Sequence, residues 1–190
     1  MNCPARRDEG LSIYGGSLSL LTDLYQLTMA YGYWRSGMAQ REACFSLSFR
    51  RNPFGGGYTI ACGIGTLASY LERFSFDTSD LDYLATLTGT DGGTVFDEGF
   101  LKFLGDSPLA CTIDAVEEGT VVFPHEPLIR VRGPIWQAQV LETAILDIIN
   151  FQTLIATKAA RVVESTAGEP VLEFGLRRAH GIDGGLSASR

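Results

Sequence analysis

Residues 133–163 read GPIWQAQVLETAILDIINFQTLIATKAARVV, and the fold depends on this stretch. Pro134 suits the first position of a helix, where a missing N–H costs nothing. From Ile135 to Val163 the apolar residues recur at helical spacing and cover a wide arc. They include Leu141, Ala144, Ile145, Ile148 and Ile149. The pattern predicts a long, largely buried helix with a break near Asn150.

The segment beyond this helix is predicted to carry an anion site. Val171–Phe174 has the pattern of a short buried strand, followed by a glycine-rich loop and the start of a helix. Arg177 and Arg178 come directly after it, at the strand end where α/β proteins place binding sites. Arginine forks bind phosphates and carboxylates, but a surface ion pair with Glu173 or Asp183 is an equally good interpretation. Because a core strand needs a partner, we expect the sequence to be truncated.

Upstream, a first helix is predicted between Thr22 and Gly37. Thr22 can cap its N-terminus, and Asp23 in the first turn suits the helix dipole. Its apolar residues recur at helical spacing; they are Leu24, Leu27, Tyr31 and Trp34. Tyr25 could stack on a flat heteroaromatic ligand. A tyrosine on a helix is more often part of the core boundary, so the pattern alone favours that alternative.

The remaining pattern mixes helices and strands. Further helices are predicted at 64–74, 77–87 and 100–104, and strands at 43–49 and, two or three of them, between 111 and 132. The RRNPFGGG loop at 50–57 could cradle a phosphate, but it lacks the Lys-Ser/Thr pair of a P-loop, and a plain connection is the favoured interpretation. The fold class is therefore α/β, with a mixed domain at 1–133 and a second unit at 134–190. Residues 1–16 are expected to form a loose arm.

Composition narrows the classes of function. The net charge is −7, which argues against a nucleic-acid or anionic-membrane binder. No apolar stretch reaches membrane-spanning length, and no secretory signal is visible, so we expect a cytoplasmic protein. The four cysteines are too sparse for a disulfide framework, and no cluster has metal-ligand spacing, so no metal site is predicted. His125 is expected to be structural, and His180 could help to bind an anion.

Six longer blocks stand out along the chain: LTDLYQLTMA (21–30), YGYWRSG (31–37), FRRNPFGGGYTIACGIG (49–65), EGTVVFPHEPLIRVR (118–132), WQAQVLETAILDIINFQTLIATKAAR (136–161) and EFGLRRAHGIDGG (173–185). Together these blocks closely resemble nicotinate phosphoribosyltransferases of the bacterial and animal type. They span nearly all of residues 17–190 in the family's order, which makes the resemblance far more specific than a short motif. One departure is His180, where the family pattern leads us to expect glutamine.

The resemblance implies a fold and a set of site residues. The fold is an α+β N-terminal domain followed by the start of an irregular α/β barrel, of the type II phosphoribosyltransferase kind. Tyr25 would stack on the pyridine ring, with Phe174 below the ring and Arg177 near the ligand's anionic groups as the catalytic residue. Asp23 and Arg178 would complete the substrate-binding set.

The resemblance also implies the reaction and its partners. Nicotinate and phosphoribosyl pyrophosphate would give nicotinate mononucleotide and pyrophosphate in NAD salvage, with ATP hydrolysed through a phosphohistidine and Mg²⁺ accompanying the phosphates. The enzyme would be a homodimer with a shared active site. The phosphohistidine and the phosphate loop would lie beyond residue 190, so this chain alone is expected to be inactive. The alternatives are a nicotinamide or quinolinate phosphoribosyltransferase, or a non-catalytic dimerising fragment.

Overall fold

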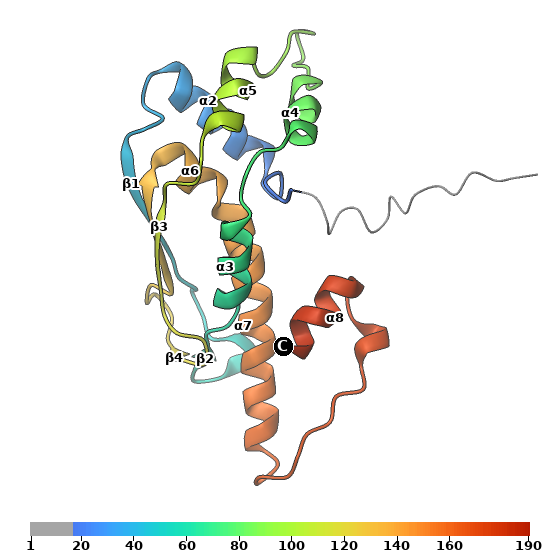
Figure 1. Ribbon diagram of the computed structural model, residues 1–190. Coiled ribbons are helices and arrows are strands. Elements are labelled where there is room, and N and C mark those ends of the chain that lie inside the picture. The colour runs from blue at the N-terminus through green and yellow to red at the C-terminus, as the bar shows by residue number, and fades with distance from the viewer. Residues whose placement is uncertain (1–16) are drawn as a thin grey trace, which may run out of the picture.

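The structure, a computed structural model, describes residues 17–190 and consists of helices arranged around two small antiparallel sheets (Figure 1). The expectation for residues 1–16 lies outside the described residues. The helices are α2 (Leu24–Arg35), α3 (Ile64–Glu72), α4 (Thr78–Ala85), α5 (Glu98–Asp106), α6 (Ile135–Val140), α7 (Glu142–Glu164) and α8 (Gly181–Ser189), with short 3₁₀ turns η1 (Pro53–Gly55) and η2 (Leu176–Arg178). The strands are β1 (Glu42–Leu47), β2 (Thr59–Ile60), β3 (Thr112–Ala115), β4 (Val121–Val122) and β5 (Ile129–Pro134).

The larger sheet has the order β1-β5-β3, with β5 at its centre. The register places Val131 opposite Phe45 on one side and opposite Ile113 on the other. Along β5, buried Ile129 and Val131 alternate with exposed Arg130 and Arg132, which is the period of two expected when one face of a strand meets the core. The smaller sheet pairs β2 with β4.

Helices α6 and α7 connect the sheets to the rest of the molecule. Trp136 on α6 is fully buried, and its ring centroid lies 5.1 Å from that of Phe103 on α5. Tyr31 on α2 in turn lies 5.1 Å from Phe100 on α5. An aromatic cluster therefore joins α2, α5 and α6. Figure 1 shows α7 as the long axis of the molecule, and it contacts β2, α3, η1 and α8.

Two helix boundaries differ from the expected ones. The N-cap of α2 is Asp23 rather than Thr22, whose hydroxyl is engaged with the carbonyl of Val140 at 3.1 Å. The long helical stretch is interrupted at Leu141, between α6 and α7, and not near Asn150. Both differences arise from packing where α6 turns into α7, because Thr22 contacts Val140 there and Leu141 is fully buried. Burial of α7 is also one-sided, since Leu146, Val162 and Val163 are exposed.

The structure contradicts the buried strand expected at Val171–Phe174. These residues form no regular element, and the Phe174 side chain is 75% exposed. A strand is stable only when another strand satisfies its backbone groups, and within residues 17–190 none lies beside this segment. Figure 1 shows the segment passing away from both sheets before the chain returns to α7 through α8. The helix start expected in the glycine-rich segment is confirmed as α8.

Candidate functional site

The start of α2 is fixed by the buried side chain of Gln26, which is 0% exposed. Its Oε1 accepts hydrogen bonds from the backbone N–H of Asp23 at 2.8 Å and from the Thr143 hydroxyl at 2.8 Å, and it also contacts the Thr22 hydroxyl. The Thr143 hydroxyl also lies 3.1 Å from Asp23 Oδ2. A buried amide must find partners within the protein. This network therefore sets the position of α2 against α7, and with it that of Tyr25.

Glu142, the first residue of α7, accepts hydrogen bonds from three donors at a single carboxylate oxygen. Its Oε2 accepts from the Tyr25 hydroxyl at 3.0 Å, from Gln26 Nε2 at 3.1 Å and from Gln139 Nε2 at 3.0 Å. Partial desolvation and the hydrogen bond to Glu142 raise the pKa of Tyr25 above its usual value, and the negative charges of Glu142 and Asp23 add to the effect. The phenol therefore stays protonated and tethered, while the Tyr25 side chain remains 49% exposed.

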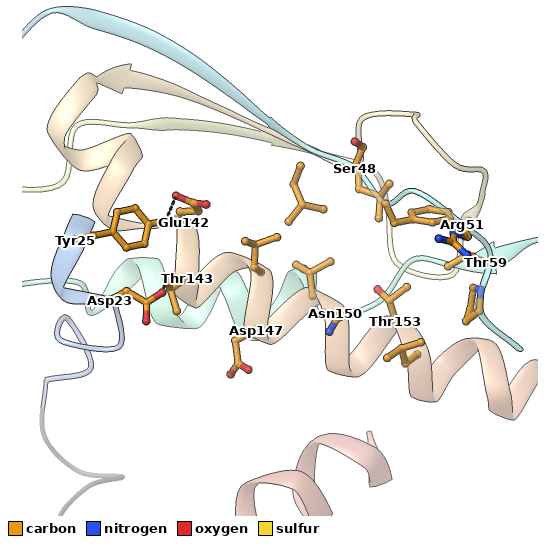
Figure 2. A pocket seen from close by; sticks show the side chains of 17 residues that line it. Asp23, Tyr25, Ser48, Arg51, Thr59, Glu142, Thr143, Asp147, Asn150 and Thr153 are labelled. Carbon is orange, nitrogen blue, oxygen red and sulfur yellow. Dashed lines mark hydrogen bonds between the residues drawn. The ribbon is translucent and has the colours of Figure 1, made fainter. Parts of the chain in front are cut away.

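A cavity of about 460 Å³ opens beside this junction and runs along α7 to the 50–57 loop. Figure 2 shows Tyr25, Asp23 and Glu142 at one end and Arg51 and Thr59 at the other. The lining residues are Asp23, Tyr25, Leu47, Ser48, Phe49, Arg51, Pro53, Thr59, Leu128, Glu142, Thr143, Leu146, Asp147, Ile149, Asn150, Thr153 and Leu154. A volume of this size is typical of small-molecule sites, and apolar walls with a few polar groups are typical of them too.

The loop that carries Arg51 is held against α7. Arg161 Nη1 donates to the Phe54 carbonyl at 3.0 Å, and Lys158 Nζ lies 4.8 Å from the centroid of the Phe54 ring. The Thr59 hydroxyl donates to Asn52 Oδ1 at 3.1 Å. The sequence favoured a plain connection here, but the structure places Arg51 in the cavity wall, where its guanidinium supplies positive charge.

Strand β2, which carries the lining residue Thr59, and the residues after it are held by threonines of α7. The backbone N–H of Ile60 donates to the Thr157 hydroxyl at 2.9 Å. The Thr153 hydroxyl donates to the Cys62 carbonyl at 3.1 Å and lies 3.2 Å from the Cys62 nitrogen. Strand β2 pairs only with β4 among the described residues, so the Thr157 hydroxyl satisfies a backbone group of β2, and the Thr153 hydroxyl satisfies those of Cys62 just beyond it.

The other predicted site residues lie elsewhere. Phe174, Arg177 and Arg178 are exposed and do not line the cavity within residues 17–190. Arg177 Nη1 donates to the Phe174 carbonyl at 3.0 Å. In the described part of the chain neither arginine forms an ion pair with Glu173 or Asp183, so that alternative is not what the structure shows. The family resemblance implied a site containing both Tyr25 and Arg177, shared between two subunits, and one copy of this chain does not bring them together.

His180 lies on a second cavity, of about 690 Å³, between α3, α7 and α8. Close to it, Glu118 accepts hydrogen bonds from the backbone N–H groups of Gly63 at 2.8 Å and Gly65 at 3.1 Å, at the start of α3. Arg190 contacts the same carboxylate through both terminal nitrogens, at 2.9 and 2.6 Å. The Arg190 contact and these amides lower the pKa of Glu118 to about 2. The ion pair ties the residue that follows α8 to the start of α3, and Arg190 also contacts Gln152, which lines the second cavity, at 3.2 Å. His125, expected to be structural, donates its backbone N–H to the Phe49 carbonyl at 2.8 Å.

The first cavity is lined by an aromatic ring and carboxylates at one end and by a positively charged side chain at the other. These groups can bind and orient a ligand. Across the described residues, no group of three His, Cys, Asp or Glu side chains is placed to hold a metal ion. Sequence reasoning missed Glu142, Asp147 and Asn150. A signal existed for Asp147 and Asn150, because with Thr143 they recur at helical spacing between apolar residues and so mark one face of the helix.

The family model that matches this chain is the N-terminal domain of nicotinate phosphoribosyltransferase (NAPRTase), over residues 20–150. The chain is 45% identical over 174 residues to a nicotinate phosphoribosyltransferase of Bacillus subtilis, covering 92% of this chain and 34% of that protein. It is 44% identical over 172 residues to one of Caenorhabditis elegans, covering 90% of this chain and 30% of that protein. The chain thus spans about a third of the length of these relatives.

Solved structures resemble the fold as well. Human nicotinic acid phosphoribosyltransferase matches with a TM-score of 0.79 and 43% identity, over 89% of this chain and 33% of that one. A nicotinate-nucleotide pyrophosphorylase from Pyrococcus furiosus matches with a TM-score of 0.63 and 18% identity, over 95% of this chain and 36% of that one. The second likeness concerns the fold alone. These matches confirm the mixed α and β fold class expected from the sequence.

Proposed function

Because this chain belongs to the nicotinate phosphoribosyltransferase family, we propose that the protein joins nicotinate to phosphoribosyl pyrophosphate in NAD biosynthesis. The structural observation that carries the proposal is Tyr25. Its hydroxyl is tied to Glu142 while its ring remains half exposed at the end of a cavity of ligand size. A flat aromatic anion such as nicotinate suits a stacking ring, because offset stacking adds to the burial of apolar surface.

In the proposed reaction, the pyridine nitrogen forms a bond to C1 of the ribose while the bond from C1 to the pyrophosphate oxygen breaks. The leaving pyrophosphate takes that electron pair, and the pyridine ring becomes a pyridinium. No proton transfer is required, so catalysis consists of positioning and electrostatic stabilisation. Tyr25 would hold the ring plane, and the nearby carboxylate of Asp23 would favour the positive charge that develops on it.

The remaining assignments complete the proposed site. Phe174 would contact the other face of the pyridine, and Arg177 would act as the catalytic residue by binding an anionic group, with Arg178 beside it. Since these three do not line the cavity of Tyr25 in one chain, a homodimer with shared sites is the arrangement we propose. Arg51 at the far end of the cavity would attract a phosphate or carboxylate.

ATP and Mg²⁺ belong to the proposal through the family resemblance. Within residues 17–190 the carboxylates, cysteines and histidines are not clustered as metal ligands, so no residue of this chain is assigned to the ion and no step is derived through it. None of the described helices is long and apolar enough to cross a membrane. We propose a cytoplasmic location on the basis of the sparse cysteines.

The proposal is tested by assaying the full-length protein with nicotinate, nicotinamide and quinolinate, each with phosphoribosyl pyrophosphate, in the presence and absence of ATP and Mg²⁺. We expect nicotinate mononucleotide as the main product and stimulation by ATP. Robust use of nicotinamide or quinolinate without use of nicotinate would overturn the assignment. A Tyr25→Ala variant is the matched test of the site, and we expect it to raise the KM for nicotinate while the protein stays folded.

A further inference from the structure

The Tyr25 ring is held at its outer end by a contact that the family resemblance does not assign. Its phenol donates to Glu142 Oε2 at 3.0 Å across 117 positions of sequence. The side chain nevertheless remains 49% exposed. A ring that is free on its surface but tethered at its hydroxyl loses less rotational freedom when a ligand stacks on it, because part of that freedom was given up on folding.

The carboxylate that holds the phenol is itself fixed. Gln26 Nε2 at 3.1 Å and Gln139 Nε2 at 3.0 Å donate to the same Oε2. Both glutamines are buried, so neither can swing away into solvent. Hydrogen bonds to a charged acceptor are shorter and stronger than neutral ones. Glu142 is therefore anchored from α2 and from α6 and can act as a fixed point for Tyr25.

We propose that Glu142 is a positioning residue that sets the orientation of the Tyr25 ring for stacking on the pyridine substrate. The proposal rests on the proposed function, because it takes the pyridine as the ligand of Tyr25. Glu142 affects the substrate only by holding Tyr25, and it forms no bond to the reacting atoms.

The variant that tests this role is Glu142→Ala, with Tyr25→Phe as its partner. Tyr25→Phe keeps the ring and removes only the hydroxyl that Glu142 holds. Both changes untether the ring, so each should raise the KM for nicotinate by about two- to tenfold, the range that a single aromatic stack can account for. The kcat should change less than the KM. The double variant should be no worse than the poorer single one, since both remove the same contact.

A matched control separates positioning from a general loss of packing. Gln137→Met removes the contacts of another buried glutamine on α6, with the Ala110 N–H at 2.8 Å and the Pro108 carbonyl at 2.8 Å, and keeps an unbranched side chain of similar length. It should lower the melting temperature, as Glu142→Ala does, but leave the KM for nicotinate unchanged. If Gln137→Met raises the KM as much as Glu142→Ala, then the effect comes from general loosening of α6 and the proposal is overturned.

A second measurement needs no enzymatic activity and can be made on this chain. 3-Fluorotyrosine is placed at position 25 alone, and its phenol is titrated by ¹⁹F NMR. Removing Glu142 should lower the pKa of that phenol, because the hydrogen bond and the negative charge both raise it. Gln137→Met should leave that pKa at the parent value, because Gln137 contacts Ala110 and Pro108 and not Glu142.

The two measurements distinguish the failure of each claim. If the full-length protein neither binds nor uses nicotinate, the proposed function fails, while the titration still decides whether Glu142 holds the Tyr25 phenol. If nicotinate is used and Tyr25→Ala raises its KM, but Glu142→Ala and Tyr25→Phe do not, then the function stands and the positioning role is wrong. An unchanged phenol pKa in Glu142→Ala would overturn the contact itself.

Discussion

Replacing Glu118 by glutamine should weaken the fold in a pH-dependent way. The carboxylate accepts two backbone N–H groups at the start of α3, from Gly63 and Gly65, and a two-bond contact from Arg190. Glutamine keeps one acceptor oxygen but carries no charge. The substitution Glu118→Gln therefore removes the attraction to Arg190 and to the positive end of α3 while preserving the shape of the side chain.

The magnitude follows from the lowered pKa. A carboxylate whose pKa falls from 4.5 to about 2 on folding contributes at most about 3 kcal/mol. The side chains of Glu118 and Arg190 are 30% and 42% exposed, so solvent screening reduces this to about 1–2 kcal/mol. Because the folded pKa lies below the unfolded one, the stabilisation is fully present above about pH 4.5 and is lost as the pH falls toward 2.

The assay is urea-induced unfolding of this chain and of Glu118→Gln at a series of pH values from about 7 to about 3. We expect the parent to be more stable by about 1–2 kcal/mol at neutral pH, with more than half of that difference gone by about pH 3. Arg190→Gln, measured alongside, reports the share that belongs to the ion pair. A difference that stays constant across the series would refute the electrostatic reasoning, because it would mean that Glu118 acts through packing alone.

Two further predictions concern the complete enzyme, and a third concerns the hydrogen bond between α7 and β2. Arg177→Ala should lower kcat/KM by about tenfold to a hundredfold, which is the cost of one charge-assisted hydrogen bond, and leave the melting temperature unchanged. A lowered melting temperature with a normal kcat/KM would mark Arg177 as structural. Mixing subunits carrying Tyr25→Ala with subunits carrying Arg177→Ala should restore about a quarter of the sites if they are shared; no recovery after demonstrated exchange would rule that out. Thr157→Val should cost about 1–3 kcal/mol in urea unfolding, because the N–H of Ile60 loses its acceptor, whereas a change below about 0.5 kcal/mol would contradict this role.

The elements that the sequence predicted well are those whose signals are local. The helix between Thr22 and Gly37 and the strand at 43–49 each follow from residues within a few positions of one another. Gly37, for example, follows the helix with a φ of 72°, a conformation that glycine adopts without strain. Tyr25 lines the cavity, but the family resemblance singled it out against the helical pattern, and its stacking on the pyridine stays a prediction.

The features that the sequence did not predict depend on contacts between distant segments. Leu141 interrupts the long helix because it is buried at a junction, and no local breaker marks that position. Residues 171–174 have a strand pattern, but no strand among residues 17–190 lies beside them. Glu142 resembles any first-turn acid until α2 is placed against it, 117 positions earlier in the chain. Periodicity reports which face of an element is apolar, but not which distant side chain meets it.

The hydrogen bonds that build the cavity also set the order in which it can form during synthesis. Tyr25 and Glu142 are separated by 117 positions, and Ile60 and Thr157 by 97. A ribosome releases its product from the N-terminus, so α2, β1 and β2 emerge before α7 has been translated. Until then water must serve as the partner of the Tyr25 phenol and of the N–H of Ile60. A nascent chain arrested before residue 142 should therefore carry α2 without a cavity beside it, and translation of α7 is the event that creates the site.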